Sequence, residues 1–189
     1  MIMNPNIHTL FDEDAISRRV NALAREIAEA KPENLLVVAV LKGSFIFAAD
    51  LVRAMHRAEL QPEMEFMHLS SYGAGTEGSD NIRILRDVES DVNGRDIILV
   101  DDILESGRTL AFAKERLTSR GARSVRIAAL LDKPERRKAA ISADYVGFAC
   151  PDKFVVGYGM DMGHAWRQLP FIGYVAPDDT GGTDGKTGG

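Results

Sequence analysis

One stretch near the middle of the chain constrains the fold more than any other, because a strand, a loop and a helix are predicted in direct succession. Residues 97–100 are consecutive aliphatic residues, the pattern of a strand that is buried on both faces of a parallel sheet. Asp101 and Asp102 follow, where we expect the strand to leave the core. Small residues then lead into residues 110–117, whose apolar spacing predicts a helix. A buried strand that leads into a helix is typical of α/β proteins.

The loop between this strand and helix has the composition of an anion-binding site. Ser106, Gly107 and Thr109 are small enough to let backbone N–H groups converge on a phosphate at a helix N-terminus. The loop matches neither the Walker pattern nor the dinucleotide fingerprint. Its distinguishing feature is the acid pair before it, Asp101 and Asp102, because carboxylates bind sugar hydroxyls directly or through Mg²⁺. We expect this segment to hold both ends of a phosphorylated sugar; the alternative is a solvated turn that ends a strand.

The rest of the pattern predicts an α/β fold with a mostly parallel, twisted sheet flanked by helices. Apolar residues at helical spacing predict helices over residues 12–27 and 45–55. Residues 71–81 are expected to form a long loop between two strands, which is uncommon unless the loop works as a lid. Aliphatic or alternating runs predict the remaining strands at residues 35–41, 64–70, 82–85, 125–131 and 143–148.

We expect residues 1–176 to form a single domain with its core at about 32–150. The segment 151–176 is rich in aromatic residues and glycine and has no clean period. We call it the hood segment and expect it to form a small hood over the sheet together with part of the N-terminus. The segment 177–189 cannot bury apolar surface and is predicted to be a disordered tail.

Composition narrows the classes of function. A formal net charge of −5 over 189 residues argues against non-specific nucleic-acid binding, which depends on a positive surface. The single cysteine, Cys150, excludes an internal disulfide and a multi-cysteine zinc site, and its apolar surroundings predict a buried, inert thiol. No stretch approaches the roughly 20 apolar residues of a membrane span, and residues 1–10 lack a secretory pattern. We therefore expect a cytoplasmic protein that acts without a membrane.

Two lysines follow predicted strands, at the sheet edge where α/β proteins bind ligands. Lys42 follows the strand at 35–41 and Lys133 follows the strand at 125–131. A lysine in such a turn is usually only solvated, so position alone does not assign either residue a role. Three basic residues come shortly after Lys133 and are expected to form a solvated patch: Arg136, Arg137 and Lys138.

The sequence VDDILESGRTL at residues 100–110 resembles the phosphoribosyl-diphosphate signature of type I phosphoribosyltransferases, and other segments narrow the resemblance to the hypoxanthine-guanine branch. It covers about residues 35–174 in five separated segments. It implies the type I phosphoribosyltransferase fold and the transfer of a 5-phosphoribosyl group from 5-phosphoribosyl 1-diphosphate to hypoxanthine or guanine. The implied products are IMP or GMP and diphosphate, in purine salvage. Mg²⁺ is the implied cofactor, and a homo-oligomer, dimer or tetramer, is the implied assembly.

The resemblance also implies roles for single residues. Asp101 and Asp102 match the acids that hold the ribose hydroxyls and Mg²⁺, and Asp161 matches the acid that binds a second Mg²⁺ on the diphosphate. Lys133 matches the lysine that donates to the exocyclic purine oxygen, which suits a 6-oxopurine because an ammonium group only donates. For the diphosphate, the implied contacts are Arg167 and the loop of Lys42 and Gly43, whose Leu41–Lys42 peptide can be cis in the family. The 5′-phosphate is implied to bind Ser106, Gly107, Arg108 and Thr109, and Ser71 and Tyr72 are implied to belong to the lid. Phe154 is implied to stack on the base, and Val155 to contact the edge of the base.

Two departures from the family pattern leave alternatives open. Glu105 stands where the family usually has the aspartate proposed to exchange a proton with the imidazole ring of the purine. Glutamate keeps this catalytic carboxylate but lengthens its reach by one methylene. Residues 162–166 replace the tyrosine and polar residues that relatives tend to carry, so a xanthine-preferring enzyme is an alternative. A nucleic-acid-binding regulator with the same fold is a further alternative.

Overall fold

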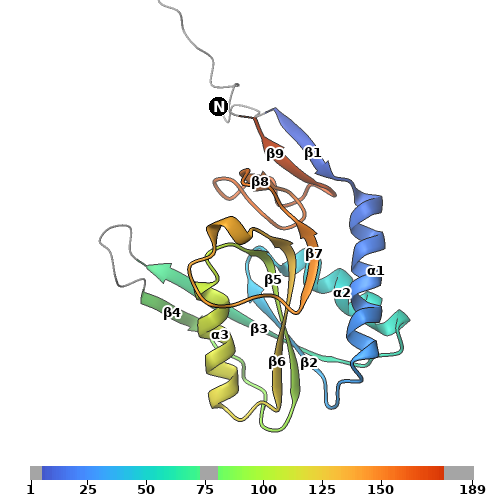
Figure 1. The fold of residues 1–189 in the computed structure, drawn as a ribbon, viewed down its shortest axis with the longest axis vertical. Helices are drawn as coiled ribbons and strands as arrows, with labels where there is room; N and C mark the ends of the chain where they lie inside the picture. The colour runs from blue at the N-terminus through green and yellow to red at the C-terminus, as the bar shows by residue number, and fades with distance from the viewer. Residues whose placement is uncertain (1–5, 73–80, 177–189) are drawn as a thin grey trace, which may run out of the picture.

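The structure is a computed structural model that describes residues 6–72 and 81–176. The strands among these residues form two β-sheets (Figure 1). The smaller sheet has the strand order β1 (Ile7–Phe11), β9 (Ile172–Val175), β8 (Val155–Val156). The larger sheet has the strand order β4 (Asn81–Arg86), β3 (Glu63–Tyr72), β2 (Leu36–Leu41), β5 (Asp96–Leu104), β6 (Ser124–Asp132), β7 (Tyr145–Ala149).

The larger sheet is mostly parallel, as predicted. All neighbouring pairs from β3 to β7 run parallel, and only β4 runs antiparallel, against β3. Residues 36–40 of β2 and 97–100 of β5 are aliphatic and buried, because helices cover both faces of a parallel sheet. Their parallel register brings the carboxyl ends of β2, β5 and β6 to one edge of the sheet.

Strand β5 is longer than the aliphatic run predicts. We expected the strand to leave the core after residue 100, with the acid pair beyond its end. Instead Asp101 pairs with Ala129 and the ladder with β6 continues through Leu104 and Asp132. The expected strand end was wrong because backbone pairing with β6 continues after the apolar run stops. The acid pair therefore lies on a strand, which holds the two carboxylates more rigidly than a turn would.

Among the described residues, α-helices cover both faces of the large sheet, with α1 (Glu13–Glu29) and α2 (Phe45–Arg57) on one face and α3 (Arg108–Ser119) on the other (Figure 1). Helix α1 begins where the Asp12 carboxylate accepts a hydrogen bond from the Ala15 N–H at 2.7 Å, which satisfies one of the unpaired donors of the first turn. Its apolar stripe packs with α2 in one core cluster. Leu110, Ala113 and Leu117 of α3 belong to the cluster on the opposite face.

The small sheet joins the two ends of the described chain. β1 pairs antiparallel with β9, and β9 pairs antiparallel with β8. Phe11 at the end of β1 stacks on Phe148 of β7, with ring centroids 4.2 Å apart, so the small sheet is packed against the edge of the large one (Figure 1). A single 3-10 turn, η1 (Pro134–Arg136), follows β6. This arrangement carries the hood segment to the carboxyl ends of the large sheet.

Parts of two predicted segments lie outside the described residues. Ser71 and Tyr72 end β3 and pair with Ile82 and Asn81 of β4, whereas residues 73–80 of the expected lid fall outside the description, as do residues 177–189 of the expected tail. Within the described ranges, no helix is both long enough and apolar enough to cross a membrane.

Candidate active site

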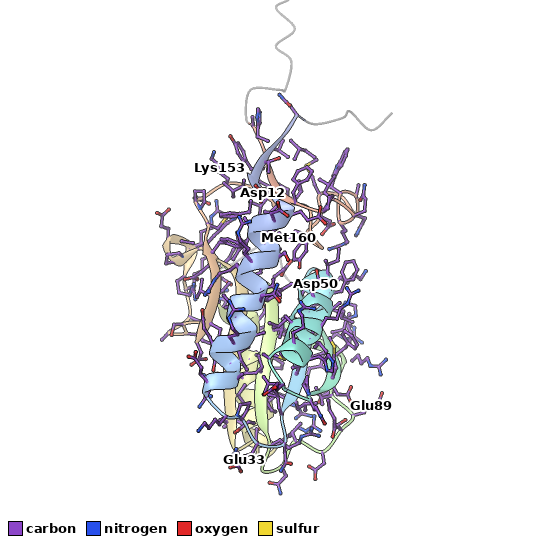
Figure 2. All side chains as sticks on the ribbon, turned by 90° about the vertical axis from the view of Figure 1, so that its right-hand side faces the viewer. Asp12, Glu33, Asp50, Glu89, Lys153 and Met160 are labelled. Atoms are coloured by element: carbon purple, nitrogen blue, oxygen red, sulfur yellow. The ribbon has the colours of Figure 1, made fainter. Side chains whose placement is uncertain are left out.

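A cavity of about 260 Å³ opens at the carboxyl edge of the large sheet, the edge where α/β folds bind ligands. The turn after β2, the end of β5 and the loop before α3 line it. Glu33, which precedes β2, lies at the opposite end of the molecule from Lys153 of the hood segment (Figure 2). The predicted site residues that line the cavity are Lys42, Gly43, Asp101, Asp102, Glu105, Ser106, Gly107 and Thr109.

The acid pair lies in this cavity, next to the loop before α3. The Asp101 carboxylate accepts a hydrogen bond from the Asp102 N–H, and the Asp102 carboxylate accepts one from the Ile103 N–H, each at 3.0 Å. Burial raises the pKa of Asp101 well above its usual range, and the negative charge of Asp102 raises it further. Burial likewise raises the pKa of Asp102. Two crowded, partly desolvated carboxylates favour a bound cation or hydroxyl donors beside them.

The acid pair fits Mg²⁺ by its donor chemistry. No cluster of three or more His, Cys, Asp or Glu side chains that could hold a metal occurs among residues 6–72 and 81–176. Such a cluster is not required, because Mg²⁺ keeps several waters and is usually bound by one or two carboxylates together with substrate phosphates. Asp101 and Asp102 supply two adjacent carboxylates in a cavity that also contains an anion-binding loop.

The turn after β2 presses closely against the acid pair. A Cβ atom on Gly43 would lie 1.7 Å from Asp102 Oδ2, so only glycine leaves room for this carboxylate. The Leu41–Lys42 peptide is cis. Ser44, which is fully buried, donates its hydroxyl to the Val40 carbonyl at 2.5 Å and closes the turn onto the strand. Lys42 is exposed and, like Gly43, lines the cavity together with the acids.

The loop before α3 forms the opposite wall of the cavity. Gly107 is the N-cap of α3 and has a positive φ of 78°, a conformation that glycine adopts without the steric penalty of a side chain. The Ser106 hydroxyl accepts a hydrogen bond from the Arg108 N–H at 3.4 Å. Thr109 lies in the first turn of α3 and lines the cavity, whereas the Arg108 side chain is exposed and does not line it. A cavity at a helix N-terminus suits an anionic group.

Arg137 packs against the loop before α3 without lining the cavity, and the sequence did not predict its burial. We expected a solvated side chain, which was wrong: only 16% of it is exposed, and it is ion-paired with Asp132. It also donates to the Leu104 and Ile141 carbonyls. The Lys138 N–H donates to the Ser106 carbonyl at 2.9 Å, so this segment braces the loop before α3. Its neighbour Arg136 is exposed. The sequence pattern does not distinguish the two, because one partner of Arg137, the Leu104 carbonyl on β5, is 33 residues away in the chain.

Lys133 and Glu105 form an ion pair at the ends of β6 and β5. Lys133 Nζ lies 2.8 Å from Glu105 Oε1, and Lys133 is 5% exposed. The same ammonium group donates to the Lys153 carbonyl of the hood segment at 2.8 Å. The structure therefore brings the candidate base-binding lysine into contact with the candidate proton acceptor. The contact joins the segments that follow two neighbouring strands, β5 and β6.

The hood segment carries an aromatic residue next in sequence to Lys153, whose carbonyl accepts from Lys133. Phe154 follows Lys153 and is 57% exposed, so a ligand can reach its side chain. Val155 begins β8 and is buried. The carbonyl of Phe154 accepts a hydrogen bond from the Val175 N–H at 3.3 Å, which ties the ring's backbone to β9. Cys150 precedes this segment; it is buried, and burial raises the pKa of its thiol.

Asp161 and Arg167 form a second charged pair of the hood segment. Arg167 lies 2.7 Å from Asp161 and donates to the Gly159 carbonyl at 2.6 Å. Burial is the main influence on the pKa of Asp102 and raises it, while the positive charge of Arg167 lowers it. Arg167 is therefore close enough to act on the acid pair electrostatically. In this structure Asp161 pairs with Arg167 and with the His164 N–H, rather than standing as a separate acid.

Comparison with known proteins agrees with this geometry. The family model described as "Phosphoribosyl transferase domain" matches residues 6–162. The hypoxanthine-guanine phosphoribosyltransferase of Bacillus subtilis is 43% identical over 89% of this chain and 92% of its own length. The bifunctional protein TilS/HprT of Listeria innocua is 45% identical over 89% of this chain, but the chain spans only about a quarter (26%) of that protein's length.

A solved structure extends the comparison to the fold. The crystal structure of a hypoxanthine-guanine phosphoribosyltransferase from Bacillus anthracis superposes with a TM-score of 0.84 at 41% identity, and the match covers 89% of this chain and 98% of that one. Sequence identity of about 40% over most of the chain, together with the match to the family model, shows common family membership and not only a similar fold. The chain therefore belongs to the phosphoribosyltransferase family, in its hypoxanthine-guanine branch.

Proposed function

We propose that this chain transfers the 5-phosphoribosyl group of 5-phosphoribosyl 1-diphosphate to hypoxanthine or guanine, forming IMP or GMP and diphosphate in purine salvage. The observation that carries the proposal is the single cavity shared by the acid pair and the loop before α3. Carboxylates that would bind ribose hydroxyls and a loop that would bind a 5′-phosphate thereby line the same cavity. The Glu105–Lys133 pair lies at the same edge, where the base must approach.

In the proposed complex, each wall of the cavity holds one part of the donor. Asp101 and Asp102 accept hydrogen bonds from the ribose hydroxyls and hold Mg²⁺. Ser106, Gly107, Arg108 and Thr109 surround the 5′-phosphate. The backbone of Lys42 and Gly43 faces the diphosphate, together with Arg167, while Asp161 binds a second Mg²⁺ there. When bound, Mg²⁺ supplies positive charge that stabilises the departing diphosphate.

The base is recognised by the residues at the end of β6 and in the hood segment. Lys133 donates to the exocyclic oxygen of the purine, and an ammonium group has no acceptor for the amino group of adenine. Phe154 stacks on the ring, and the backbone of Val155 reads its edge. Because Lys133 already donates to the Lys153 carbonyl, its ammonium group is oriented before the base arrives, which lowers the cost of ordering it.

The reaction is a substitution at the anomeric carbon. A bond forms between this carbon and a nitrogen of the purine imidazole ring, the bond from the carbon to the diphosphate oxygen breaks, and the imidazole proton passes to the Glu105 carboxylate. Lys133 leaves Glu105 to bind the purine oxygen, so base binding frees the carboxylate for this proton. Ser71 and Tyr72 lead into the proposed lid, which excludes water that would otherwise hydrolyse the donor.

A product assay tests the proposal directly. The protein is incubated with 5-phosphoribosyl 1-diphosphate and Mg²⁺ and with hypoxanthine, guanine, xanthine or adenine in turn, and the nucleotide product is quantified. We expect turnover with hypoxanthine or guanine and none with adenine. A clear preference for xanthine would move the assignment to the alternative enzyme that residues 162–166 leave open. Absence of turnover with every base, combined with a nucleic-acid mobility shift, would favour the regulator.

We also propose the organisation in which this activity operates. Residues 1–176 act as one domain, with the hood segment closing over the core. The chain works in the cytoplasm as a homo-oligomer, dimer or tetramer. Size-exclusion chromatography with light scattering tests the assembly, and limited proteolysis that leaves one resistant fragment supports the single domain.

A further inference from the structure

One hydrogen bond ties helix α2 to the hood segment behind the cavity. The Tyr158 hydroxyl donates to Asp50 Oδ2 at 2.7 Å. Tyr158 is only 6% exposed, and both burial and the neighbouring Asp50 raise the pKa of its phenol, so the group stays a hydrogen-bond donor at neutral pH. Figure 2 shows Asp50 on α2 close to the segment that carries Met160. Neither residue lines the cavity of the candidate active site.

Tyr158 occupies a backbone position that ordinarily selects a different residue. Gly157, Tyr158 and Gly159 all have positive φ, at 94°, 48° and 104°. Gly157 and Met160 exchange two backbone hydrogen bonds of 3.0 Å, so these residues form a tight hairpin turn. Such turns favour glycine and asparagine, and a left-handed conformation costs other residues roughly 1 to 2 kcal/mol. A buried tyrosine at this position is therefore explained by its side chain, which anchors the turn to α2.

The anchored turn packs directly against the diphosphate side of the cavity. A Cβ atom on Gly159 would lie 2.1 Å from the Gly43 carbonyl oxygen, so the two backbones are in close contact. Gly43 in turn touches the Asp102 carboxylate. The turn also holds Arg167, because Gly159 exchanges two hydrogen bonds with it: the Arg167 guanidinium donates to the Gly159 carbonyl at 2.6 Å, and the Gly159 N–H donates to the Arg167 carbonyl at 3.0 Å.

We propose that the Tyr158–Asp50 hydrogen bond is a positioning contact that sets Arg167 and the Lys42–Gly43 backbone in place for the diphosphate of the donor. This inference rests on the proposed function and adds two positioning residues to it. The contact acts on the donor rather than on the base, because the base-binding Lys133 is held from another direction, by Glu105 and the Lys153 carbonyl.

The test compares the affinity for donor and for base in Tyr158→Phe, a variant that lacks only the hydroxyl. Binding of 5-phosphoribosyl 1-diphosphate with Mg²⁺ is measured by calorimetry, and KM is measured for donor and base separately. We expect the Kd and KM of the donor to rise about fivefold to tenfold, as the loss of one hydrogen bond that orders a site implies. The KM of the base should change less than about twofold.

Matched variants separate positioning from general stability. Tyr145→Phe removes the hydroxyl of another buried tyrosine, on β7, and is expected to leave donor binding unchanged. Asp50→Asn keeps an oxygen acceptor for Tyr158 and should retain donor affinity within about threefold, whereas Asp50→Ala should match Tyr158→Phe. Unchanged donor affinity in Tyr158→Phe would overturn the inference, as would equal losses for donor and base that follow a fall in melting temperature. If the unmodified chain bound donor but turned over no base, the proposed function would be wrong. The comparison of donor Kd between the unmodified chain and Tyr158→Phe would still test this inference.

Discussion

Lys133 carries base recognition in the proposed reaction, and its environment explains why a lysine suits that role. Only 5% of the residue is exposed, so its charge must be compensated locally, which Glu105 and the Lys153 carbonyl do. An incoming purine oxygen replaces the Glu105 contact rather than adding to an unpaired charge. The exchange keeps the ammonium group satisfied before and after binding, which limits the desolvation cost.

Replacing Lys133 by alanine removes the donor to the purine oxygen. We expect kcat/KM for hypoxanthine to fall about 10-fold to 100-fold or more, because a charge-assisted hydrogen bond contributes roughly 1.5 to 3 kcal/mol. Steady-state assays with hypoxanthine measure this effect. Lys138→Ala, which changes an exposed lysine nearby, serves as the control and should retain full activity. Preserved activity in Lys133→Ala would remove the base-recognition assignment.

Gly43 has no side chain because Asp102 occupies the space that one would need. In Gly43→Ala the new Cβ would meet Asp102 Oδ2 at 1.7 Å, so the carboxylate or the turn must move. A displacement of about 1 Å in a reacting site costs on the order of 100-fold in rate, and we expect a loss of that size in kcat/KM for the donor.

A second glycine provides the matched control for Gly43→Ala. Gly94 has a positive φ of 71° and nothing within 4 Å of an added Cβ. Gly94→Ala should therefore lower the free energy of unfolding by about 1 kcal/mol through backbone strain, with activity unchanged. Full activity in Gly43→Ala would show that Asp102 does not need its observed position.

At the scale of elements, strand β5 carries acidic residues at both ends, and the two ends differ in how these acids are stabilised. Its carboxyl end holds the acid pair, whose pKa values burial raises, so the charged form of these acids is a stability cost that suits ligand binding. Its amino end begins with Asp96, which is buried and well partnered. The carboxyl end of the strand therefore carries acids whose charge is destabilised by burial, and its amino end carries an acid stabilised by hydrogen bonds.

The pairing of Asp96 predicts how stability depends on pH. Hydrogen bonds from Arg123 hold the pKa of Asp96 well below its usual range. The folded protein therefore gains stability above the unfolded pKa of about 4, and loses it as the pH falls toward the folded pKa. In Asp96→Asn we expect the free energy of unfolding at pH 7 to drop by about 1 kcal/mol, a modest value because Arg123 is partly exposed. Below pH 4 the difference from the unmodified chain should shrink.

Urea unfolding at several pH values measures this dependence. Glu89→Gln is the control, because Glu89 pairs with Arg86 on the surface, where both side chains are more than half exposed, and such pairs contribute little. Its unfolding curve should follow that of the unmodified chain at each pH. A constant difference between Asp96→Asn and the unmodified chain down to pH 2 would contradict the assignment of the shift to Asp96.

At the scale of the whole molecule, the proposed site joins the large sheet to the hood segment. Lys133 binds the Lys153 carbonyl on one side of the edge, and Gly43 meets Gly159 on the other. A donor that contacts the large sheet and Arg167 together links the two parts. Ligand binding should therefore stabilise the whole chain, and not the cavity alone.

This linkage predicts a thermal shift that depends on Mg²⁺. Donor at 100 times its Kd contributes about 2.7 kcal/mol to the folded state, which for a chain of this size raises the melting temperature by roughly 5 to 10 °C. We expect this shift with Mg²⁺ and a much smaller one after chelation, measured by differential scanning fluorimetry. Chelator alone should leave the melting temperature of the ligand-free protein unchanged. An equal shift with and without Mg²⁺ would contradict the metal's role in holding the donor.

Much of the fold was predictable from local patterns. Aliphatic runs and helical spacing predicted the central strands and the helices α1, α2 and α3 to within a few residues, because hydrophobic periodicity is a local consequence of burial. The α/β class was confirmed, as was the mostly parallel order of the large sheet. Of the site, the acid pair and the loop before α3 were predictable together because they are adjacent in the chain, and the structure places them in one cavity.

Other features depend on partners far away in the chain. The end of β5 depends on pairing with β6, and the burial of Arg137 depends on contacts at the ends of β5 and β6. The hydrogen bond between Tyr158 and Asp50 joins residues that are 108 positions apart. No local pattern encodes such pairings, because each depends on where the whole fold places the second residue.

The sequence by itself predicted most strands of the large sheet, its helices and a set of candidate site residues, because hydrophobic periodicity and short motifs are local patterns. Only the tertiary structure decided that Glu105 pairs with Lys133, that the Asp102 carboxylate occupies the space beside Gly43, and that the hood segment contacts the edge of the large sheet. The physical reason is that contacts between distant segments are selected by packing of the entire core, where interiors are close-packed and each position constrains its neighbours.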